Sequence, residues 1–276
     1  MTDSPPYDQL FIYEVSGDAR PALGSGLAEF LGLWLEGDTS FIFFSSPADE
    51  QVAGILARGP GLRLLASHHL TYEQWQGGLA MEPLELEGLA VAPAWREYHA
   101  PPGRLVLRLD PGLVFGNGLH PTTRHCLELL LLRAQREPLG RVLDLGCGTG
   151  ILGLAALLLG AEDVLAVDLN PLCVSTTRRN AELNGLPLAV EEGPARAYLE
   201  RPANLVMANV HWQVQQELWE RDQPLNGKED LILSGVMRSQ RGLLEGLLAT
   251  RGFKVRERRE AENTWFTIWA CRSQKD

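Results

Sequence analysis

The chain has 276 residues, is 45% hydrophobic and carries a formal net charge of −10. That length is enough for two domains that each bury a core. It has no apolar run of about 18 residues, and its start lacks a basic region and an apolar core, so we expect no membrane span, no signal peptide and a cytoplasmic location. The acidic charge disfavours direct binding to a nucleic-acid backbone and suits a basic protein partner.

The four cysteines are scattered, with no Cys-x-x-Cys pair. This spacing predicts free thiols and no metal site. One of them, Cys147, lies inside a glycine-rich turn with no base beside it in the sequence. We therefore interpret Cys147 as a small buried residue and not as a nucleophile.

Residues 1–80 are predicted to form a small α+β domain. Strands are expected where apolar residues alternate or run together, at 10–16, 39–46 and 62–68. Helical periodicity is expected in two segments, at 23–36, where the stripe runs into a strand, and at 50–59. The resulting order of strand, helix, strand, strand, helix, strand is that of a ferredoxin-like fold.

No pattern in this first domain indicates catalysis. Trp34 and residues 41–44 are interpreted as core, and the pair His68 and His69 has no third metal ligand in view. Residues 81–103 are marked by proline and glutamate and are predicted to be a linker. The linker leads to a second domain over residues 104–276.

The second domain begins with a strand and a loop that contains two glycines. A helix then opens at Pro121, with Thr122 and Thr123 in its first turn. Proline is favourable at a first helical position, and the free amides and hydroxyls there are able to bind an anion. Thr123 is therefore a candidate contact for a carboxylate, with simple helix capping as the alternative.

The run 141–150, RVLDLGCGTG, carries an apolar strand directly into a glycine turn. Gly146, Gly148 and Gly150 let the backbone turn tightly and approach a ligand without side chains in the way. Asp168 closes the next apolar strand, at about the 20-residue spacing where a nucleotide-binding βαβ unit places the acid for both ribose hydroxyls. The segment predicts a pocket for a nucleoside cofactor.

Two later segments complete the α/β pattern. The run 204–212 is a strand whose end delivers Asn209 to the carboxyl edge of the sheet, where ligands of open α/β folds collect. Residues 253–260 and 264–272 read as a terminal hairpin of two long strands. A terminal antiparallel hairpin distinguishes the seven-strand, Rossmann-like sheet of class I methyltransferases from a dinucleotide-binding sheet.

The glycine motif also bears on the ligand. It is one residue shorter than the dinucleotide fingerprint Gly-x-Gly-x-x-Gly. Asp144, just before the turn, would repel a pyrophosphate but accept a hydrogen bond from an ammonium group. S-adenosylmethionine has both a ribose and an ammonium group, so a methyltransferase is favoured and an NAD-linked oxidoreductase is the weaker alternative.

Several segments together resemble one known family, the bacterial methyltransferases that trimethylate the stalk-base protein of the large ribosomal subunit, the eleventh L-protein. The resemblance covers nearly the whole chain, and its most specific motif is FGNGLHPTT at 115–123. The other matching segments are YEQW, LDLGCGTGILGLAA, AVDLNP, NAELNG, LVMANV and LSGVMRSQ.

The resemblance implies a set of site residues. Thr123, Gly146, Asp168 and Asn209 match the family's cofactor contacts, while Gly148 and Gly150 follow from the turn geometry. Asn209 is also expected to line the methyl-transfer position as the catalytic residue. The reaction implied is in-line methyl transfer to lysine or N-terminal amines, with no metal and no covalent intermediate.

The resemblance also implies separate roles for the two domains. Residues 1–80 would recognise a basic ribosomal protein and move on the 81–103 linker, with the whole chain a monomer. Two alternatives stay open: a noncatalytic module that binds S-adenosylmethionine, and a paralogue that methylates another protein or a planar amide nitrogen. The last rests on Trp212, three residues after Asn209, where it is placed to stack on a planar group.

Overall fold

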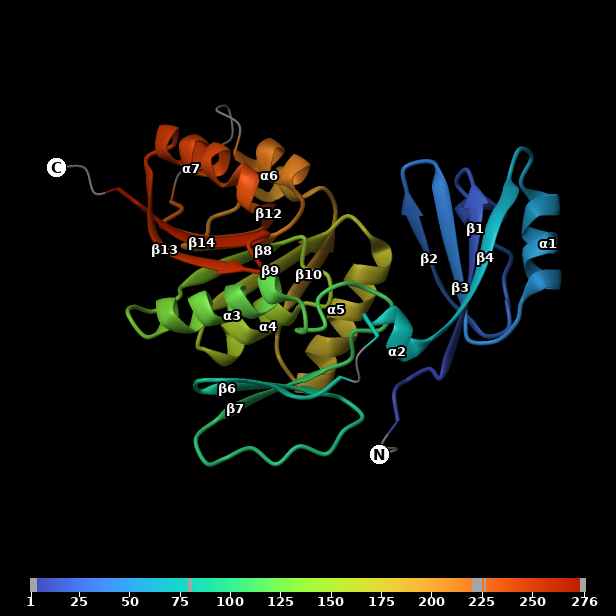
Figure 1. The fold of residues 1–276 in the computed structure, drawn as a ribbon, viewed down its shortest axis with the longest axis horizontal. Helices are drawn as coiled ribbons and strands as arrows, with labels where there is room; N and C mark the ends of the chain where they lie inside the picture. Colours follow the sequence, from blue (N-terminus) through green and yellow to red (C-terminus); the bar gives the residue numbers. More distant parts are fainter. Residues whose placement is uncertain (1–3, 79–80, 220–224, 226, 274–276) are drawn as a thin grey trace. The chain divides into compact units, whose positions relative to one another are not determined.

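The computed structural model describes residues 4–78, 81–219, 225 and 227–273 (Figure 1). Two compact units are present, residues 1–81 with 95–97 and residues 82–94 with 98–276. The predicted boundary after residue 80 falls on residues 79 and 80, which lie outside the described residues. Among the helices of the described residues, none combines the length and the apolar character that a bilayer crossing requires.

The first unit is a four-stranded antiparallel sheet with the strand order β2-β3-β1-β4. This order, with every neighbouring pair antiparallel, is the predicted ferredoxin-like arrangement. Its core lies between one face of the sheet and helix α1, where Tyr13, Ile42 and Ile55 are buried. The elements are β1 (Gln9–Ser16), β2 (Phe30–Glu36), β3 (Thr39–Phe44), α1 (Asp49–Arg58), β4 (Arg63–Thr71) and α2 (Tyr72–Trp75).

The helix expected within residues 23–36 is wrong. The chain forms only a 3₁₀ turn, η1 (Arg20–Ala22), and then runs irregularly to β2. Gly24 and Gly26 fall in this segment, and Gly26 has a φ of +75°, a left-handed conformation that ends helical periodicity. The apolar stripe therefore belongs mostly to the strand.

The prediction of a linker over residues 81–103 is also wrong for most of its length. Strands β5 (Leu84–Leu86) and β6 (Leu89–Pro93) form a hairpin, and β6 pairs in parallel with β7 (Leu105–Leu109). Every residue of β6 is buried. The apolar run in β6 was the missed signal, since a solvated linker has no reason to contain one.

The second unit is built on a seven-stranded sheet with the strand order β10-β9-β8-β11-β12-β14-β13. The first five strands pair in parallel, and β14 and β13 add the antiparallel hairpin that was predicted from the sequence. The strands are β8 (Arg141–Leu145), β9 (Asp163–Asp168), β10 (Ala189–Glu192), β11 (Leu205–Asn209), β12 (Asp230–Met237), β13 (Phe253–Ala261) and β14 (Trp265–Arg272).

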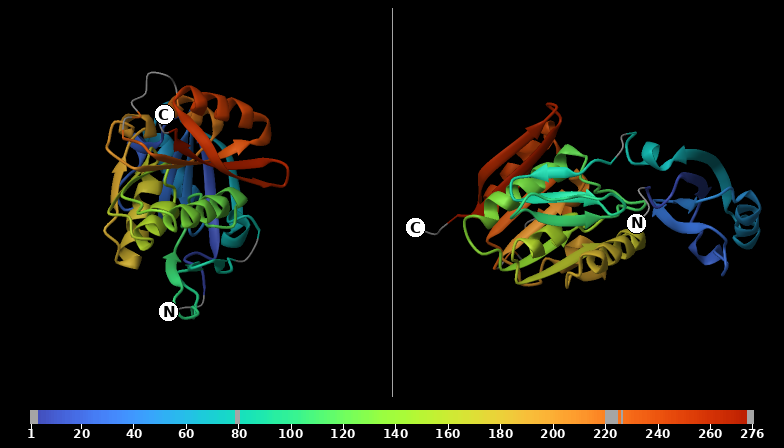
Figure 2. Two further views of the ribbon diagram at one scale, coloured as in Figure 1. Left: turned by 90° about the vertical axis from the view of Figure 1, so that its left-hand side faces the viewer. Right: turned by 90° about the horizontal axis from the view of Figure 1, so that it is seen from below.

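Helices cover both faces of this sheet (Figures 1 and 2). Two large apolar clusters, one on each face, make up its core. The small β5-β6-β7 sheet packs outside α4 and α5 and extends one of these layers. The helical elements are α3 (Pro121–Ala134), α4 (Ile151–Leu158), α5 (Pro171–Asn184), η2 (Ala195–Tyr198), α6 (Trp212–Trp219), η3 (Arg238–Gln240) and α7 (Arg241–Thr250).

Candidate active site

The predicted site residues meet at one edge of the seven-stranded sheet. Gly146 follows β8, and Asp168 and Asn209 close β9 and β11, the two strands that pair with β8 on either side. The direction of strand order reverses at β8, and open α/β sheets bind ligands in the crevice at such a point. The fold therefore brings together residues that are far apart in the sequence.

The turn after β8 requires its three glycines. Gly146, Gly148 and Gly150 have φ values of +76°, +56° and +81°. A Cβ atom at Gly146 would lie 2.3 Å from Val210 Cγ1, and one at Gly148 would lie 2.5 Å from the Phe115 carbonyl oxygen. The turn is therefore pressed against Val210 after β11 and against the loop before α3, with no room for a side chain at either contact.

Replacing Gly148 with alanine should lower the free energy of unfolding by more than about 2 kcal/mol. The left-handed conformation costs a non-glycine residue roughly 1–2 kcal/mol, and the clash with the Phe115 carbonyl adds a packing penalty. Gly160→Ala is the matched control, because Gly160 has a φ of +89° with nothing within 4 Å of an added Cβ. Urea unfolding of both variants tests the difference, and equal losses would contradict the close approach.

Asp168 is oriented by two backbone amides. Its Oδ2 accepts from the Gly148 N–H at 3.0 Å and its Oδ1 from the Asn170 N–H at 2.9 Å. Burial raises the pKa of Asp168, and these amide hydrogen bonds partly offset the rise. Each carboxylate oxygen keeps a further lone pair for a ligand hydroxyl.

Asp144 lies buried beneath the glycine turn. Its Oδ2 accepts from the Gly153 N–H at 2.9 Å, whereas its Oδ1 is buried with no hydrogen-bond partner among the described residues. Burial raises the pKa of Asp144 to about 7. An orphaned carboxylate oxygen at this position fits a ligand that carries a positive charge and not one that carries a pyrophosphate.

The raised pKa of Asp144 predicts a pH-dependent stability. The folded protein holds a proton that the unfolded chain releases near 3.8, so this contribution to stability is present at low pH and is lost as the pH rises through about 7. Asp144→Asn should therefore gain stability relative to the native protein between about pH 5 and about pH 8. Denaturation midpoints at the two pH values test this, with Asp163→Asn at the exposed start of β9 as control; a pH-independent difference would contradict it.

The loop before α3 closes over the glycine turn. Thr149 donates its hydroxyl hydrogen to the Gly116 carbonyl at 2.8 Å, and His120 forms the N-cap of α3 with Pro121 in the first turn. This cap leaves Thr123 buried in the first turn of the helix. The Asn209 Nδ2 donates to Thr123 Oγ1 at 3.4 Å, so the structure also joins these two predicted residues.

Sequence reasoning assigned no role to Asn180, which links the site to the rest of the unit. Its Nδ2 donates to the carbonyls of Thr149 and Asp110 at 2.9 and 3.0 Å, and its Oδ1 accepts from the Asp110 N–H at 2.9 Å. Asn180 is fully buried on α5. An asparagine on the apolar side of a helix was the available signal, because a buried amide needs partners on another segment.

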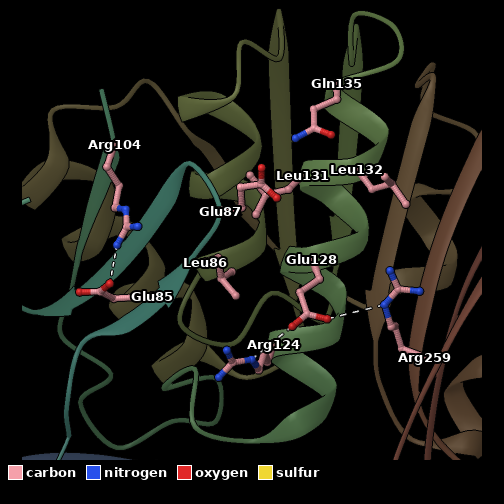
Figure 3. A pocket seen from close by; sticks show the side chains of 10 residues that line it. All are labelled: Glu85, Leu86, Glu87, Arg104, Arg124, Glu128, Leu131, Leu132, Gln135 and Arg259. Atoms are coloured by element: carbon pink, nitrogen blue, oxygen red, sulfur yellow. Dashed lines mark hydrogen bonds and ion pairs between the residues drawn. The ribbon is translucent and has the colours of Figure 1, made fainter. Parts of the chain in front are cut away.

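A cleft of about 660 Å³ lies elsewhere in the second unit (Figure 3). It lies between β5, α3 and β13, and three ion pairs lie along it: Glu85 with Arg104, and Glu128 with both Arg124 and Arg259. None of the predicted cofactor residues is among those that line it. The cleft is therefore separate from the site at the sheet edge.

The metal-ligating side chains and the cysteine thiols bear on two other kinds of chemistry. Among the described residues, no group of three or more His, Cys, Asp or Glu is placed to hold a metal ion. Cys126, Cys147 and Cys173 are buried free thiols, and burial raises the pKa of each. These thiols are therefore poorly suited to act as nucleophiles.

Fold and site together define a class I methyltransferase: a seven-stranded sheet with a terminal antiparallel hairpin, a Gly-x-Gly-x-Gly turn after the central strand and an acid at the end of the next. The family profile described as "Ribosomal protein L11 methyltransferase (PrmA)" matches residues 72–273. The chain belongs to this family.

Individual relatives agree. A ribosomal protein L11 methyltransferase from Parasynechococcus marenigrum is 44% identical over 182 residues, 62% of this chain and 62% of that protein. One from Pelotomaculum thermopropionicum is 36% identical over 230 residues, 80% of this chain and 73% of its own. A crystal structure of ribosomal protein L11 methylase from Lactobacillus delbrueckii subsp. bulgaricus matches with a TM-score of 0.63 and 31% identity, over 70% of this chain and 99% of that one.

Proposed function

We propose that the protein is an S-adenosylmethionine-dependent N-methyltransferase that modifies lysine or N-terminal amines of a ribosomal protein, L11 or a close counterpart. The observation that carries the proposal is the meeting of the glycine turn, Asp168 and the Thr123–Asn209 pair at one sheet edge. Membership in the L11 methyltransferase family supports the substrate class.

The residues present suit this cofactor. Asp168 accepts hydrogen bonds from the ribose hydroxyls, because both of its oxygens are already oriented and retain lone pairs. Gly146–Gly150 pass beneath the methionine part, where a side chain would not fit. The Thr123 hydroxyl, in the first turn of α3, meets the cofactor carboxylate. The buried Asp144 compensates the cofactor's positive charge.

When bound, S-adenosylmethionine supplies a methyl group on a positively charged sulfur, ready for transfer. Asn209 lines the transfer position, and its side-chain oxygen accepts from the substrate amine and aims the nitrogen lone pair. Such orientation contributes several kcal/mol. A lysine amine, with a pKa near 10.4 in water, must also lose its proton, and desolvation in the pocket favours the neutral form.

The first unit recognises the protein substrate through the face of its sheet opposite α1. A hollow of about 260 Å³ lies there, with Trp34, Phe41 and Trp75 among the apolar residues that line it and Glu14 and Glu36 as acids. Trp34 and Phe41, interpreted from the sequence as core, are only partly buried. An apolar hollow with acidic residues suits a basic, partly apolar segment of a ribosomal protein.

The proposal also covers the kind of partner, the location in the cell and the oligomeric state. The net charge of −10 favours a basic protein over a nucleic acid as partner. The protein acts in the cytoplasm, where ribosomal proteins are made, and as a monomer with both units in one chain.

The test is methyl transfer itself. Purified protein is incubated with methyl-labelled S-adenosylmethionine and large-subunit ribosomal proteins from cells that lack the enzyme, and labelled positions are found by mass spectrometry. We expect label on L11, at lysine or N-terminal amines, and strongly reduced label with Asn209→Ala. Label on a different protein would overturn the substrate, and cofactor binding without label anywhere would overturn the enzymatic activity.

A further inference from the structure

Three aromatic rings lie against one another near the candidate active site. The Phe115 and His120 ring centroids are 5.4 Å apart, and those of His120 and Trp265 are 4.9 Å apart, both pairs in edge-on geometry. Phe115 and His120 come from the loop before α3, and Trp265 is the first residue of β14. The fold thus assembles the cluster from segments that are distant in the sequence.

The cluster is close to the residues assigned to methyl transfer. His120 caps α3, and the Thr123 N–H donates to its carbonyl at 3.1 Å, while Thr123 contacts Asn209. Trp265 pairs with Met237, at the carboxyl end of β12, so it lies at the same edge of the sheet as Asn209. His120 therefore lies about one helical turn from Thr123, the residue that contacts Asn209.

The cluster presents an aromatic surface without positive charge. Phe115 is 58% exposed, although its carbonyl is held against Gly148. His120 Nδ1 lies 2.7 Å from Thr122 Oγ1 and accepts from the Thr122 N–H at 3.3 Å, so both contacts hold the ring in place. Burial lowers the pKa of His120, so the imidazole is uncharged near neutral pH. An exposed aromatic group beside a reaction site is a candidate ligand contact.

A carboxylate accompanies the rings. Glu262 lies at the tip of the β13–β14 hairpin, exposed, and its charge acts on His120. Glu262 and Asn263 have φ values of +54° and +53°, and the Thr264 N–H donates to the Ala261 carbonyl at 2.9 Å, which defines a tight two-residue turn. The turn holds an acidic residue three positions before Trp265, and its charge attracts a cationic side chain.

From this arrangement we infer that Phe115, His120 and Trp265 form the contact surface for the substrate's ammonium group after it has been methylated. The inference rests on the proposed function. A methylated ammonium loses one N–H donor with each methyl group, so Asn209 alone holds the trimethylated product poorly. Aromatic faces bind quaternary ammonium through cation–π attraction, which needs no N–H.

This contact explains how one amine is methylated repeatedly. In each round the nitrogen lone pair forms the new N–C bond while the C–S bond breaks, and its electron pair stays on sulfur. The product ammonium then loses a proton to water before the next round, except after the third, when no proton remains. A surface that retains the partly methylated amine near Asn209 favours the next round over release.

Binding without cofactor is the first test. The probes are two peptides that carry either trimethyl-lysine or its neutral isostere, with carbon in place of the quaternary nitrogen. We expect the native protein to prefer the charged peptide by about two- to thirtyfold. Trp265→Leu should reduce this preference to near unity, and Trp265→Phe should retain part of it. An unchanged preference in Trp265→Leu would overturn the inference.

Trp212→Leu is the matched control, because Trp212 also lies beyond the carboxyl edge, at the start of α6. Loss of the preference in this variant alone would assign the contact to Trp212 and overturn the role of Trp265. The second readout is the ratio of mono-, di- and trimethylated product, which should shift towards fewer methyl groups in Trp265→Leu. Absence of methylation by the native protein would overturn the proposed function instead, and the peptide comparison would still test the rings.

Discussion

Asp168→Ala should weaken S-adenosylmethionine binding by about a hundredfold or more. Each hydrogen bond to a charged acceptor contributes about 1.5–3 kcal/mol, and the two ribose hydroxyls lose their shared acceptor. The substitution also leaves the Gly148 and Asn170 amides without the carboxylate that accepts their hydrogen bonds. Isothermal titration with the cofactor measures the loss directly, before any protein substrate is needed.

Two further variants separate the loss of the ribose acceptor from the loss of an acidic residue in general. Asp168→Asn keeps one oxygen acceptor and should lose less affinity than alanine. Asp163→Ala changes the exposed acid at the opposite end of the same strand, β9, and should bind the cofactor like the native protein. Native affinity in Asp168→Ala would show that the ribose lies elsewhere and would remove the main support for the proposed site.

The second large effect concerns stability. Asp230→Ala should lower the free energy of unfolding by about 3–5 kcal/mol, because it removes the buried carboxylate that pairs with Arg133 and leaves this guanidinium only backbone carbonyls and the exposed Glu137. In the native protein Arg133 Nε donates to Asp230 Oδ2 at 2.6 Å, and Trp269 Nε1 donates to Asp230 Oδ1 at 2.6 Å. All three side chains are buried, so water cannot replace the missing carboxylate.

The exposed ion pair of Glu245 and Arg258 is the comparison for the buried one. Glu245→Ala should lower the free energy of unfolding by less than about 1 kcal/mol. Combining Asp230→Asn with Arg133→Met should recover much of the lost stability, because the buried charge is gone and Trp269 keeps an acceptor. Urea denaturation of the four proteins measures these differences. A loss in Asp230→Ala no larger than in Glu245→Ala would contradict the buried network.

Parts of the fold with local causes were predictable. The glycine turn, Asp168 at the end of β9 and the terminal hairpin each depend on residues close together in the chain, and the structure has all three. The helix expected over 23–36 was wrong because apolar spacing alone does not distinguish a stripe that belongs to an edge strand. The linker expected over 81–103 was wrong. Its proline and glutamate residues are typical of a linker, but its apolar run forms the buried strand β6.

The candidate site likewise combines features that are set by the local sequence with contacts that are made only by the tertiary structure. The sequence by itself determined the glycine turn with φ above zero, the helix cap and the strand-end acid, because each is set by its immediate neighbours. Only the tertiary structure decided which of them meet: Thr123 with Asn209, Asn180 with the glycine turn, and Trp265 with His120. These contacts depend on strand order and helix packing, which gather segments with no local signal for one another.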